Sequence, residues 1–433
     1  MPTHDDRDLD IVVHGATGFV GTLTAARLAT VANDDLRIGL SGRSRARLAA
    51  VRDDLGDAAA AWPLLEVDAL DDDDMARLAG SAHVVVSTVG PYARLGIPLV
   101  RACARAGTHY ADLTGETVFM RESIDTAHDV AVASGARIVH SCGFDSIPSD
   151  LGVFLLAEHA RANDLGTLGS TTLVVKAMRG GISGGTVDSM RGMIDQGISD
   201  PDQRRVLTDS HALSPDRDAE PGPPDRDPVG IIHDPDLGGW LAPFVMGMVN
   251  SRVVRRSNAL SDHAMGRDLE YRELMLAGGL PFGPAKAAAI AAGPPALAAG
   301  LAFPPTRALL DRVLPAPGDG PSEATRDAGF FRIDIHTTTT TGARLVCEIA
   351  VDGDPGYRAT AVMLSESAMA LAGDPGQLPD RSGVLTPSTG IGHELARRLR
   401  AAGQRYDVVE VDGGDGGDGD DGGDGGTGAT AGT

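Results

Sequence analysis

The sequence predicts an α/β fold, in which a doubly wound parallel sheet is followed by an α+β unit with antiparallel strands. Short apolar segments alternate with helical patterns over residues 9–140, as in open parallel sheets. A glycine-rich turn follows the first of these segments, and the alternation stops near Gly143. The chain of 433 residues also exceeds the roughly 250–300 residues at which single cores stop growing. We therefore expect two domains.

The predicted parallel sheet rests on apolar runs that stop at glycine, proline or polar residues. The first strand, residues 9–14, ends at Gly15; a helix through Ala32 and a strand over residues 36–41 complete a β-α-β unit. Strands and helices are expected to alternate further, with strands at 62–68, 83–89, 109–112 and 137–140 and helices at 45–55, 98–106 and 118–134. This pattern predicts a Rossmann-type, dinucleotide-binding domain over residues 1–147.

The pattern changes in the second part of the chain. A helix is expected at residues 149–160 and a strand at 171–179, and the β-branched stretch 332–349 predicts two antiparallel strands that turn near Thr341 and Gly342. We assign residues 148–358 to an α+β substrate domain. Helices at 359–372 and 392–402 are expected to return to the first domain, so that residues 359–411 form a C-terminal segment.

Charge and composition exclude several classes of function. The chain has 60 acidic and 38 basic residues, and its net charge of −22 argues against a nucleic-acid partner. Part of this charge lies in the Gly-Asp repeat of residues 412–433, which we expect to be disordered, and part in a Pro- and acid-rich stretch, 214–236, which is expected to be a surface loop. The cysteines and histidines lack the spacing of a metal site, so none is predicted.

The sequence has only weak features of the kind that direct a protein to a membrane. The N-terminal residues are polar and acidic, unlike a secretory signal. The most apolar stretch, residues 285–303, contains Gly293, Pro294 and Pro295, and therefore falls short of the roughly 20 uninterrupted apolar residues of a spanning helix. We expect a cytoplasmic protein without a transmembrane segment, and peripheral contact with a membrane stays open.

The segment Gly15-Ala-Thr-Gly-Phe-Val-Gly21 is a variant of the dinucleotide-binding fingerprint. Glycine permits the tight turn, the close approach of a pyrophosphate and close helix packing, while the helix that follows offers free N–H groups. The alternative is a glycine-rich turn without a ligand. The preceding strand and the following helix favour the cofactor site, whose residues from this loop would be Gly15, Thr17, Gly18, Phe19, Val20 and Gly21.

The end of the second strand discriminates between the two nicotinamide dinucleotides. NAD enzymes commonly place an acidic residue there, whereas this chain has Arg43, whose guanidinium can bind a 2′-phosphate with two parallel hydrogen bonds. We therefore expect NADP(H). Arg45 and Arg47 add positive charge, although both could simply be solvated residues of a helix start. The remaining predicted cofactor residues flank Arg43 or end the strand at 83–89, and are Ser41, Gly42, Ser44, Thr88, Val89 and Gly90.

Several motifs resemble one family along most of the chain. The glycine-rich loop, Ser41-Gly-Arg-Ser44, Val89-Gly-Pro-Tyr92, Tyr110-Ala-Asp-Leu-Thr-Gly-Glu116 and Cys142-Gly-Phe-Asp-Ser-Ile-Pro-Ser-Asp150 resemble the saccharopine dehydrogenase-like oxidoreductases, most of all the actinobacterial trans-acting enoyl reductases. The resemblance implies NADPH as hydride donor. It also implies a lipid or polyketide-derived acyl substrate, which a synthase could present and whose carbon–carbon double bond is reduced.

Reduction of an enoyl group needs a proton donor near the nicotinamide. Tyr92, Tyr110 and Asp145 are the candidates, because they follow strands at the edge where such sheets bind ligands. The alternative is a polar network that holds the domains together, with Tyr92 packed between them and Asp145 capping a helix. Two other functions stay open at this point: a non-catalytic NADP sensor or scaffold at a lipid surface, and a saccharopine-type amino-acid oxidoreductase.

Overall fold

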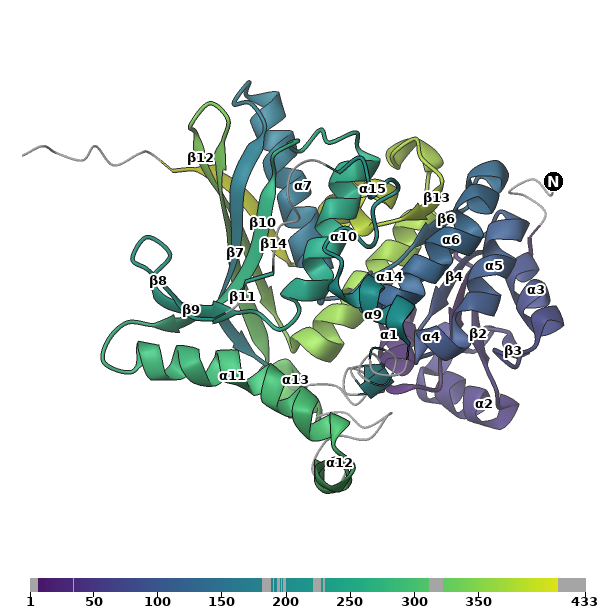
Figure 1. Ribbon diagram of the computed structural model, residues 1–433. Helices are drawn as coiled ribbons and strands as arrows, with labels where there is room; N and C mark the ends of the chain where they lie inside the picture. Colours follow the sequence, from purple (N-terminus) through teal and green to yellow (C-terminus); the bar gives the residue numbers. More distant parts are fainter. Residues whose placement is uncertain are drawn as a thin grey trace, which may run out of the picture.

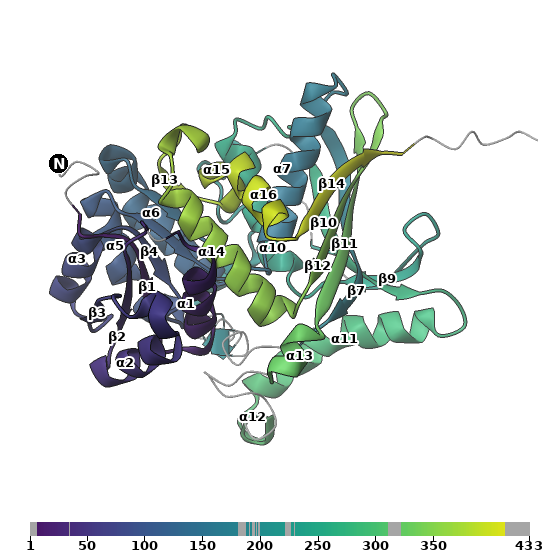
Figure 2. The same ribbon diagram turned by 180° about the vertical axis from the view of Figure 1, so that it is seen from behind.

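The computed structural model describes residues 7–411, except residue 34 and residues 181–187, 190, 193–194, 196, 198–199, 221–226, 229 and 311–321. The Gly-Asp segment 412–433, for which we expected disorder, lies outside the described residues. Two seven-stranded sheets dominate the structure, with helices between them (Figures 1 and 2).

The first sheet is parallel throughout and has the order β13-β6-β5-β4-β1-β2-β3. Its strands are β1 (Leu9–His14), β2 (Ile38–Gly42), β3 (Leu64–Glu66), β4 (Ala82–Ser87), β5 (His109–Asp112), β6 (Arg137–Val139) and β13 (Gly383–Leu385). All six residues of β4 are buried, as expected of a strand that is covered on both faces. The predicted Rossmann-type sheet is therefore confirmed, and β13 extends it at the edge beyond β6.

Helices connect these strands in the order that a doubly wound sheet requires. They are α1 (Phe19–Val31), α2 (Arg45–Asp54), α3 (Asp72–Ser81), α4 (Tyr92–Leu95), α5 (Ile97–Ala106) and α6 (Thr117–Ser134). Helix α3 has no counterpart among the predicted elements. It begins at the N-cap Asp71, whose side chain accepts hydrogen bonds from the backbone of Asp73 and Asp74.

The second sheet is mixed and has the order β14-β12-β11-β7-β10-β9-β8. Its strands are β7 (Leu168–Arg179), β8 (Ile232–Asp234), β9 (Gly239–Pro243), β10 (Glu270–Gly278), β11 (Phe330–Thr339), β12 (Arg344–Asp352) and β14 (Arg405–Glu410). Strands β7 and β10 are parallel, and the other neighbours are antiparallel. The predicted hairpin is confirmed as β11 and β12. The stretch 214–236 is not entirely loop, because β8 pairs with β9.

Helices of the second part of the chain lie between the two sheets and along the lower surface in Figure 1. Helices α7 (Ile147–Ala162), α10 (Gly247–Leu260) and α14 (Thr360–Leu371) pack between the sheets, and α14 contacts α1, β4 and β5. The other helical segments are α9 (Pro201–Thr208), α11 (Gly283–Ala302), α12 (Pro304–Leu310), α13 (Glu323–Asp327), the π-helical turn Pro355–Ala359, α15 (Pro387–Gly390) and α16 (His393–Ala401). One apolar cluster joins both sheets, from Val86 in β4 to Ile335 in β11.

The apolar stretch 285–303 differs from the expectation. We expected Gly293, Pro294 and Pro295 to interrupt it, but α11 continues through all three. The helix contacts β9, β10 and α12, with its packed residues Ala287, Ile290 and Ala291 before the two prolines and the buried Leu301 after them. Among the described residues, α11 is the one helix that is long and apolar enough to cross a membrane.

Candidate cofactor and active site

Three loops meet at the carboxyl edge of the parallel sheet. Strand β1 pairs with β2 and with β4, and His14 lies opposite both Ser41 and Ser87. The residues that follow these strands, among them Gly15 and Thr88, therefore share one edge. The strand order also reverses at this point, since the chain runs from β1 outward through β2 and returns to β4 on the other side of β1. Open α/β sheets bind ligands at such a switch point.

Glycine is required at both ends of the fingerprint loop. Gly15 has φ +87°, and a Cβ atom there would lie 2.7 Å from Thr88 Oγ1. At Gly21 a Cβ would lie 2.8 Å from the carbonyl carbon of Gly15, so that any side chain would separate α1 from the loop. Thr88 fixes this arrangement, because its hydroxyl donates to the carbonyls of His14 and Gly15, each at 3.2 Å.

The N-terminus of α1 is open to an anion. Its N-cap is Gly18, which has no side chain to accept from the first N–H groups of the helix, and Thr17 to Val20 are all at least partly exposed. Such a helix start combines free donors with a partial positive charge, which fits a pyrophosphate. The Phe19 ring packs edge-on against Tyr357, with 4.8 Å between centroids, so we assign Phe19 a contribution through its backbone only.

The arginines after β2 point to different places. Arg43 is exposed and forms no hydrogen bond or ion pair with another described residue. Arg47 reaches back to the fingerprint loop, where its guanidinium donates to the carbonyl of Thr17 at 3.2 Å. Arg45 donates instead to Leu64 in β3, away from that loop. The geometry thus leaves Arg43 available for a 2′-phosphate and places Arg47 beside the pyrophosphate loop.

Two serines at the end of β2 have structural partners. Ser41 is buried, and its hydroxyl lies 3.0 Å from His14 Nδ1, which ties β2 to β1. Burial lowers the pKa of His14 to about 4, so this histidine is neutral at pH 7. Ser44 is the N-cap of α2 and accepts from the backbone of Arg47. The predicted roles of Ser41 and Ser44 at the cofactor therefore stay predictions.

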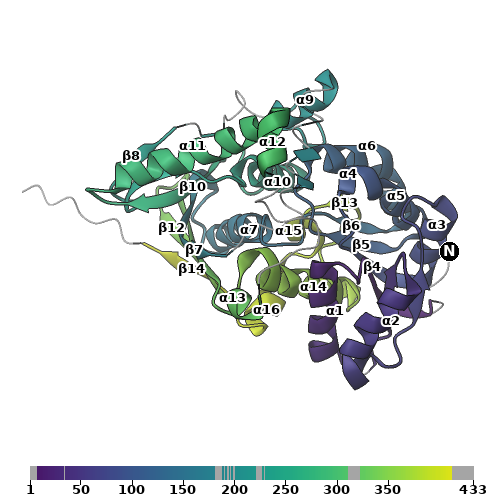
Figure 3. The same cartoon turned by 90° about the horizontal axis from the view of Figure 1, so that it is seen from below.

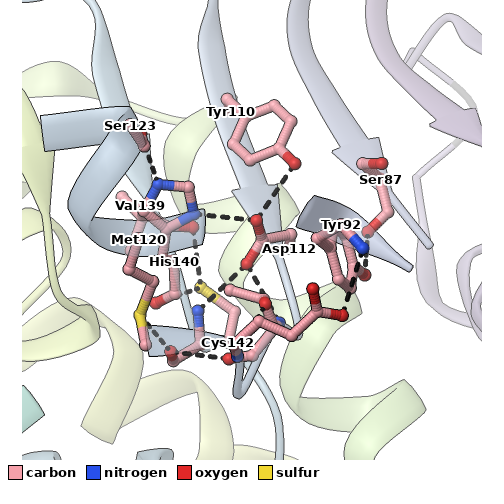
Figure 4. Close-up of polar contacts among 12 residues, drawn as sticks. Ser87, Tyr92, Tyr110, Asp112, Met120, Ser123, Val139, His140 and Cys142 are labelled. Atoms are coloured by element: carbon pink, nitrogen blue, oxygen red, sulfur yellow. Dashed lines mark hydrogen bonds and ion pairs between the residues drawn. The ribbon is translucent and has the colours of Figure 1, made fainter. Parts of the chain in front are cut away.

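A buried polar cluster occupies the next part of the same edge, after β5 and β6 (Figure 4). Asp112 accepts from the Tyr110 hydroxyl at 3.0 Å and lies 2.8 Å from His140 Nδ1, while His140 Nε2 lies 2.7 Å from the Ser123 hydroxyl. The other oxygen of Asp112 accepts from the backbone of Thr114 and Ser141, each at 3.1 Å. Every oxygen of the carboxylate is thus engaged, and the side chain has no exposed surface.

Both tyrosine candidates are committed to hydrogen bonds inside the protein. The Tyr92 hydroxyl donates to the carbonyl of Ser87 at 3.0 Å, and the side chain is buried. Burial raises the pKa of Tyr92 and of Tyr110 well above the ordinary range. Glu116 holds the start of α4 by accepting from the backbone of Tyr92 and Ala93. These contacts favour the polar-network interpretation of Tyr92 and Tyr110 over a role as proton donors.

Asp145 differs from both tyrosines. It lies on the loop between β6 and α7, is partly exposed, and makes no hydrogen bond to another described residue. Removal of water from around its carboxyl raises the pKa of Asp145 to about 6. A carboxyl with a raised pKa can exchange protons near neutral pH, so Asp145 stays a candidate for proton transfer, whereas both tyrosine hydroxyls are engaged inside the protein.

Two further buried carboxyls connect elements of the molecule, and neither was among the predicted site residues. Asp150 accepts from Ser257 and from the backbone and hydroxyl of Ser388. Glu273 accepts from Tyr271 at 2.7 Å and from Asn250 at 3.0 Å. Burial raises the pKa of Asp150 to about 6 and that of Glu273 to about 7. The contacts of Asp150 join segments more than 100 residues apart, so no local pattern could reveal them.

The cluster around Asp112 carried a weak signal in the sequence. Asp112 ends β5 and His140 directly follows β6, and these strands are parallel neighbours, with Ala111 opposite Val139. Once the strand order is known, adjacency of the two side chains follows from the register. Among the described residues no group of three or more His, Cys, Asp or Glu side chains could hold a metal ion.

Comparisons with known proteins agree with this geometry. Residues 11–139 match the family model of the saccharopine dehydrogenase NADP binding domain. A Mycobacterium tuberculosis protein, whose name gives trans-acting enoyl reductase as a provisional assignment, is 50% identical over 412 residues, covering 93% of this chain and 97% of the relative. A trans-acting enoyl reductase of Mycobacterium ulcerans is 45% identical over 410 residues, covering 92% and 97%.

Among solved structures, the fold resembles apo saccharopine dehydrogenase (L-Glu forming) from Saccharomyces cerevisiae, with a TM-score of 0.52 and 14% identity over 93% of this chain and all of that chain. This likeness shows the fold alone. The residues at the switch point fit a dinucleotide, because the loop admits only glycine at its ends and the start of α1 keeps its donors open. The cofactor is NADP(H). The chain belongs to the family of saccharopine dehydrogenase-like oxidoreductases, in which its relatives are the trans-acting enoyl reductases.

Proposed function

We propose that this protein is an NADPH-dependent enoyl reductase that reduces a carbon–carbon double bond of a lipid or polyketide-derived acyl intermediate. The observation that carries the proposal is identity of 45–50% over more than nine-tenths of the chain to proteins named trans-acting enoyl reductases. The same relatives favour this function over a saccharopine-type reaction or a non-catalytic sensor. The names of these relatives contain the word trans-acting. By analogy, we infer that a synthase presents the acyl chain to this protein, which we place in the cytoplasm.

Different residues of this chain bind the cofactor and transfer the proton. NADPH, when bound, supplies a hydride to the β carbon of the conjugated double bond. We assign the pyrophosphate to the start of α1 with Arg47 beside it, and the 2′-phosphate to Arg43. Contacts beyond the pyrophosphate are assigned to Thr88, Val89 and Gly90, which continue the same edge. These groups place the cofactor and leave the proton transfer to another residue.

Asp145 is the proposed proton donor to the α carbon. A general acid works best when its pKa lies near the operating pH, and burial moves the pKa of Asp145 from the ordinary aspartate range to about 6. The acid is active when protonated, so the rate should fall as the pH rises through about 6. Tyr92 and Tyr110 would instead hold the strand ends in place through Ser87 and Asp112.

The test is a steady-state assay with enoyl thioesters, on free and carrier-bound acyl chains, that follows NADPH oxidation and identifies the saturated product by mass spectrometry. We expect turnover with the wild-type protein. In Asp145→Asn we expect a fall in kcat of about 10²–10⁴-fold and loss of the pH dependence near 6, with unchanged NADPH affinity. Asp129→Asn, at an exposed position of α6, is the control and should leave kcat unchanged.

Two outcomes would contradict the proposal at different points. Tight NADPH binding without reduction of any enoyl thioester would remove the reductase function. Turnover that survives in Asp145→Asn with an unaltered pH profile would keep the reductase function and assign the proton transfer to a different group.

A further inference from the structure

Helix α11 exposes a face that a water-facing helix seldom has. Its buried and half-buried positions, such as Ala287, Ile290 and Ala291, pack against Trp240 of β9 and its neighbours. The opposite face is exposed and almost entirely apolar, and consists of Ala285, Ala288, Ala289, Ala292, Ala296 and Ala299. Lys286 is the single charged residue of the helix. Surface helices normally carry charged or polar residues on this face.

Large apolar side chains lie exposed just beyond both ends of α11. Leu280 is 80% exposed and Phe282 is 78% exposed before its first turn, and Phe303 is 59% exposed and Leu309 62% exposed after its last. Figure 3 views the molecule from below and shows α11 and α12 at the near surface. Contiguous exposed apolar surface of this kind marks contact with a protein or a membrane.

The charge of this segment decides between kinds of partner. The chain has 60 acidic residues among 433, yet residues 274–310 contain no Asp or Glu. Their charged side chains are Lys286 and Arg307, and Arg307 forms an ion pair with Asp195 at 3.0 Å, which offsets the charge of that carboxylate. A bilayer surface is neutral or negative, and acidic residues would be repelled or would have to lose their water on approach. The segment that forms the patch thus carries no acidic residue of its own that would oppose contact with lipid headgroups.

The packing of α11 argues against a membrane-spanning helix. Ala287, Ile290 and Ala291 pack on the second sheet and the helix also contacts α12, so it cannot cross a bilayer without losing these contacts. Ala287 is fully buried against Ala242 and Ala277. An apolar helix that is held flat against a folded domain suits the interface of a membrane rather than its interior.

From these observations we propose that α11 with its flanking residues Leu280, Phe282, Phe303 and Leu309 is a peripheral docking surface for a phospholipid bilayer. Burial of apolar surface among the acyl chains supplies most of the attraction, so anionic lipid is not required. This surface does not depend on the proposed reductase function, and would bring the protein to the phase in which long acyl chains reside.

Flotation of the full-length protein with vesicles tests the proposal. The probes are vesicles of phosphatidylcholine alone and of phosphatidylcholine with phosphatidylglycerol, and we expect the protein to float with both. Phe282→Ser and Phe303→Ser should each lower the partition coefficient by about tenfold, the effect of losing one inserted aromatic side chain. Ala289→Glu, which places a charge on the exposed face without weakening the helix, should act in the same direction.

The matched control is Leu70→Ser, because Leu70 is 62% exposed but lies before α3, on a different part of the molecule. It should leave flotation unchanged, and NADPH titration should show that all variants are folded. The proposal is overturned if wild type fails to float, if the patch variants float as wild type does, or if they change the oligomeric state in the absence of lipid. That last outcome would assign the surface to a second copy of the chain.

Discussion

The two halves of the carboxyl edge of the parallel sheet differ in whether their polar groups are hydrogen-bonded within the protein. In the half formed by β1, β2 and β4, the start of α1 lacks a side-chain cap and Arg43 has no described partner. In the half formed by β5 and β6, Asp112 and His140 are buried and bonded to neighbouring groups. A polar group binds a ligand only if the protein has not already satisfied it. The first half is therefore suited to binding, and the buried cluster of the second half to holding the structure together. Asp145, on the loop after β6, is the exception in the second half, because it makes no hydrogen bond to another described residue.

The largest expected effect comes from removing the Asp112 carboxylate from the half formed by β5 and β6, which we call the closed half; the other half is called the open half. In Asp112→Ala, the Tyr110 hydroxyl, the His140 ring and the N–H groups of Thr114 and Ser141 all lose their acceptor. Leaving such groups buried and unpaired should lower the free energy of unfolding by about 3–5 kcal/mol. Urea unfolding measures this change, and NADPH affinity measured on the folded fraction should change by less than about threefold.

The control for this variant is Asp125→Ala. Asp125 lies on α6, is 58% exposed and pairs with Arg121. In the variant the Arg121 guanidinium keeps its hydrogen bonds to the carbonyls of Ala212 and Ser214, so the loss should be about 1 kcal/mol. If Asp112→Ala were as stable as Asp125→Ala, the interpretation of the cluster as a structural network would be wrong.

A second variant disrupts the open half by placing an added side-chain atom against the backbone of the fingerprint loop. Gly21→Ala places a Cβ against the carbonyl of Gly15, which α1 or the loop can relieve only by moving. We expect a loss of about 1–3 kcal/mol in stability from overpacking and at least tenfold weaker NADPH binding, measured by fluorescence titration. Gly80→Ala is the control, because a Cβ at Gly80 meets nothing within 4 Å. Equal NADPH affinity in the two variants would show that the close approach of α1 is unimportant.

The sequence was informative wherever the determinant was local. The fingerprint loop, the strand ends and the β11–β12 hairpin follow from glycine positions and apolar runs, and the structure has them. Strand β13 has three residues and pairs with β6 from the other end of the chain, so its register depends on a fold that no local pattern describes. The expectation for α11 was wrong because Pro294 and Pro295 usually break a helix, whereas this helix continues through both.

The site shows the same difference between local features, which the sequence reveals, and contacts that depend on the whole fold. The position of Arg43 directly after the second strand was predictable from the motif, and its role at the cofactor stays a prediction. The engagement of Tyr92 with Ser87 was not, since nothing in the residue types says whether a phenol at a strand end points into the sheet or toward a ligand. Buried contacts such as Asp150 with Ser388 need the three-dimensional arrangement of α7 and α15.

The arginines offer a sharper test of the open half. Arg43→Ala should weaken NADPH binding by about ten- to a hundredfold, the effect of losing charge-assisted hydrogen bonds worth about 1.5–3 kcal/mol, and should leave NADH binding unchanged. Arg45→Ala is the matched control, because Arg45 donates to Leu64 and not toward the fingerprint loop. Titration of each variant with both cofactors measures the effect. A similar loss for NADPH and NADH in Arg43→Ala would contradict the assignment of Arg43 to the 2′-phosphate.

The smallest expected effect distinguishes the two interpretations of Tyr92, which lies where the open half meets the closed half. Its hydroxyl donates to Ser87 within the sheet, so Tyr92→Phe should cost only about 0.5–1.5 kcal/mol of stability for one lost hydrogen bond. The ring still packs against Phe119 in the variant, since their centroids lie 5.5 Å apart and the substitution keeps the ring. Thermal unfolding measures the change in stability, and a steady-state assay with an enoyl thioester measures the change in kcat. We expect kcat to stay within about threefold of wild type, whereas a fall of about a hundredfold or more would identify Tyr92 as a proton donor and move the boundary of the open half to include it.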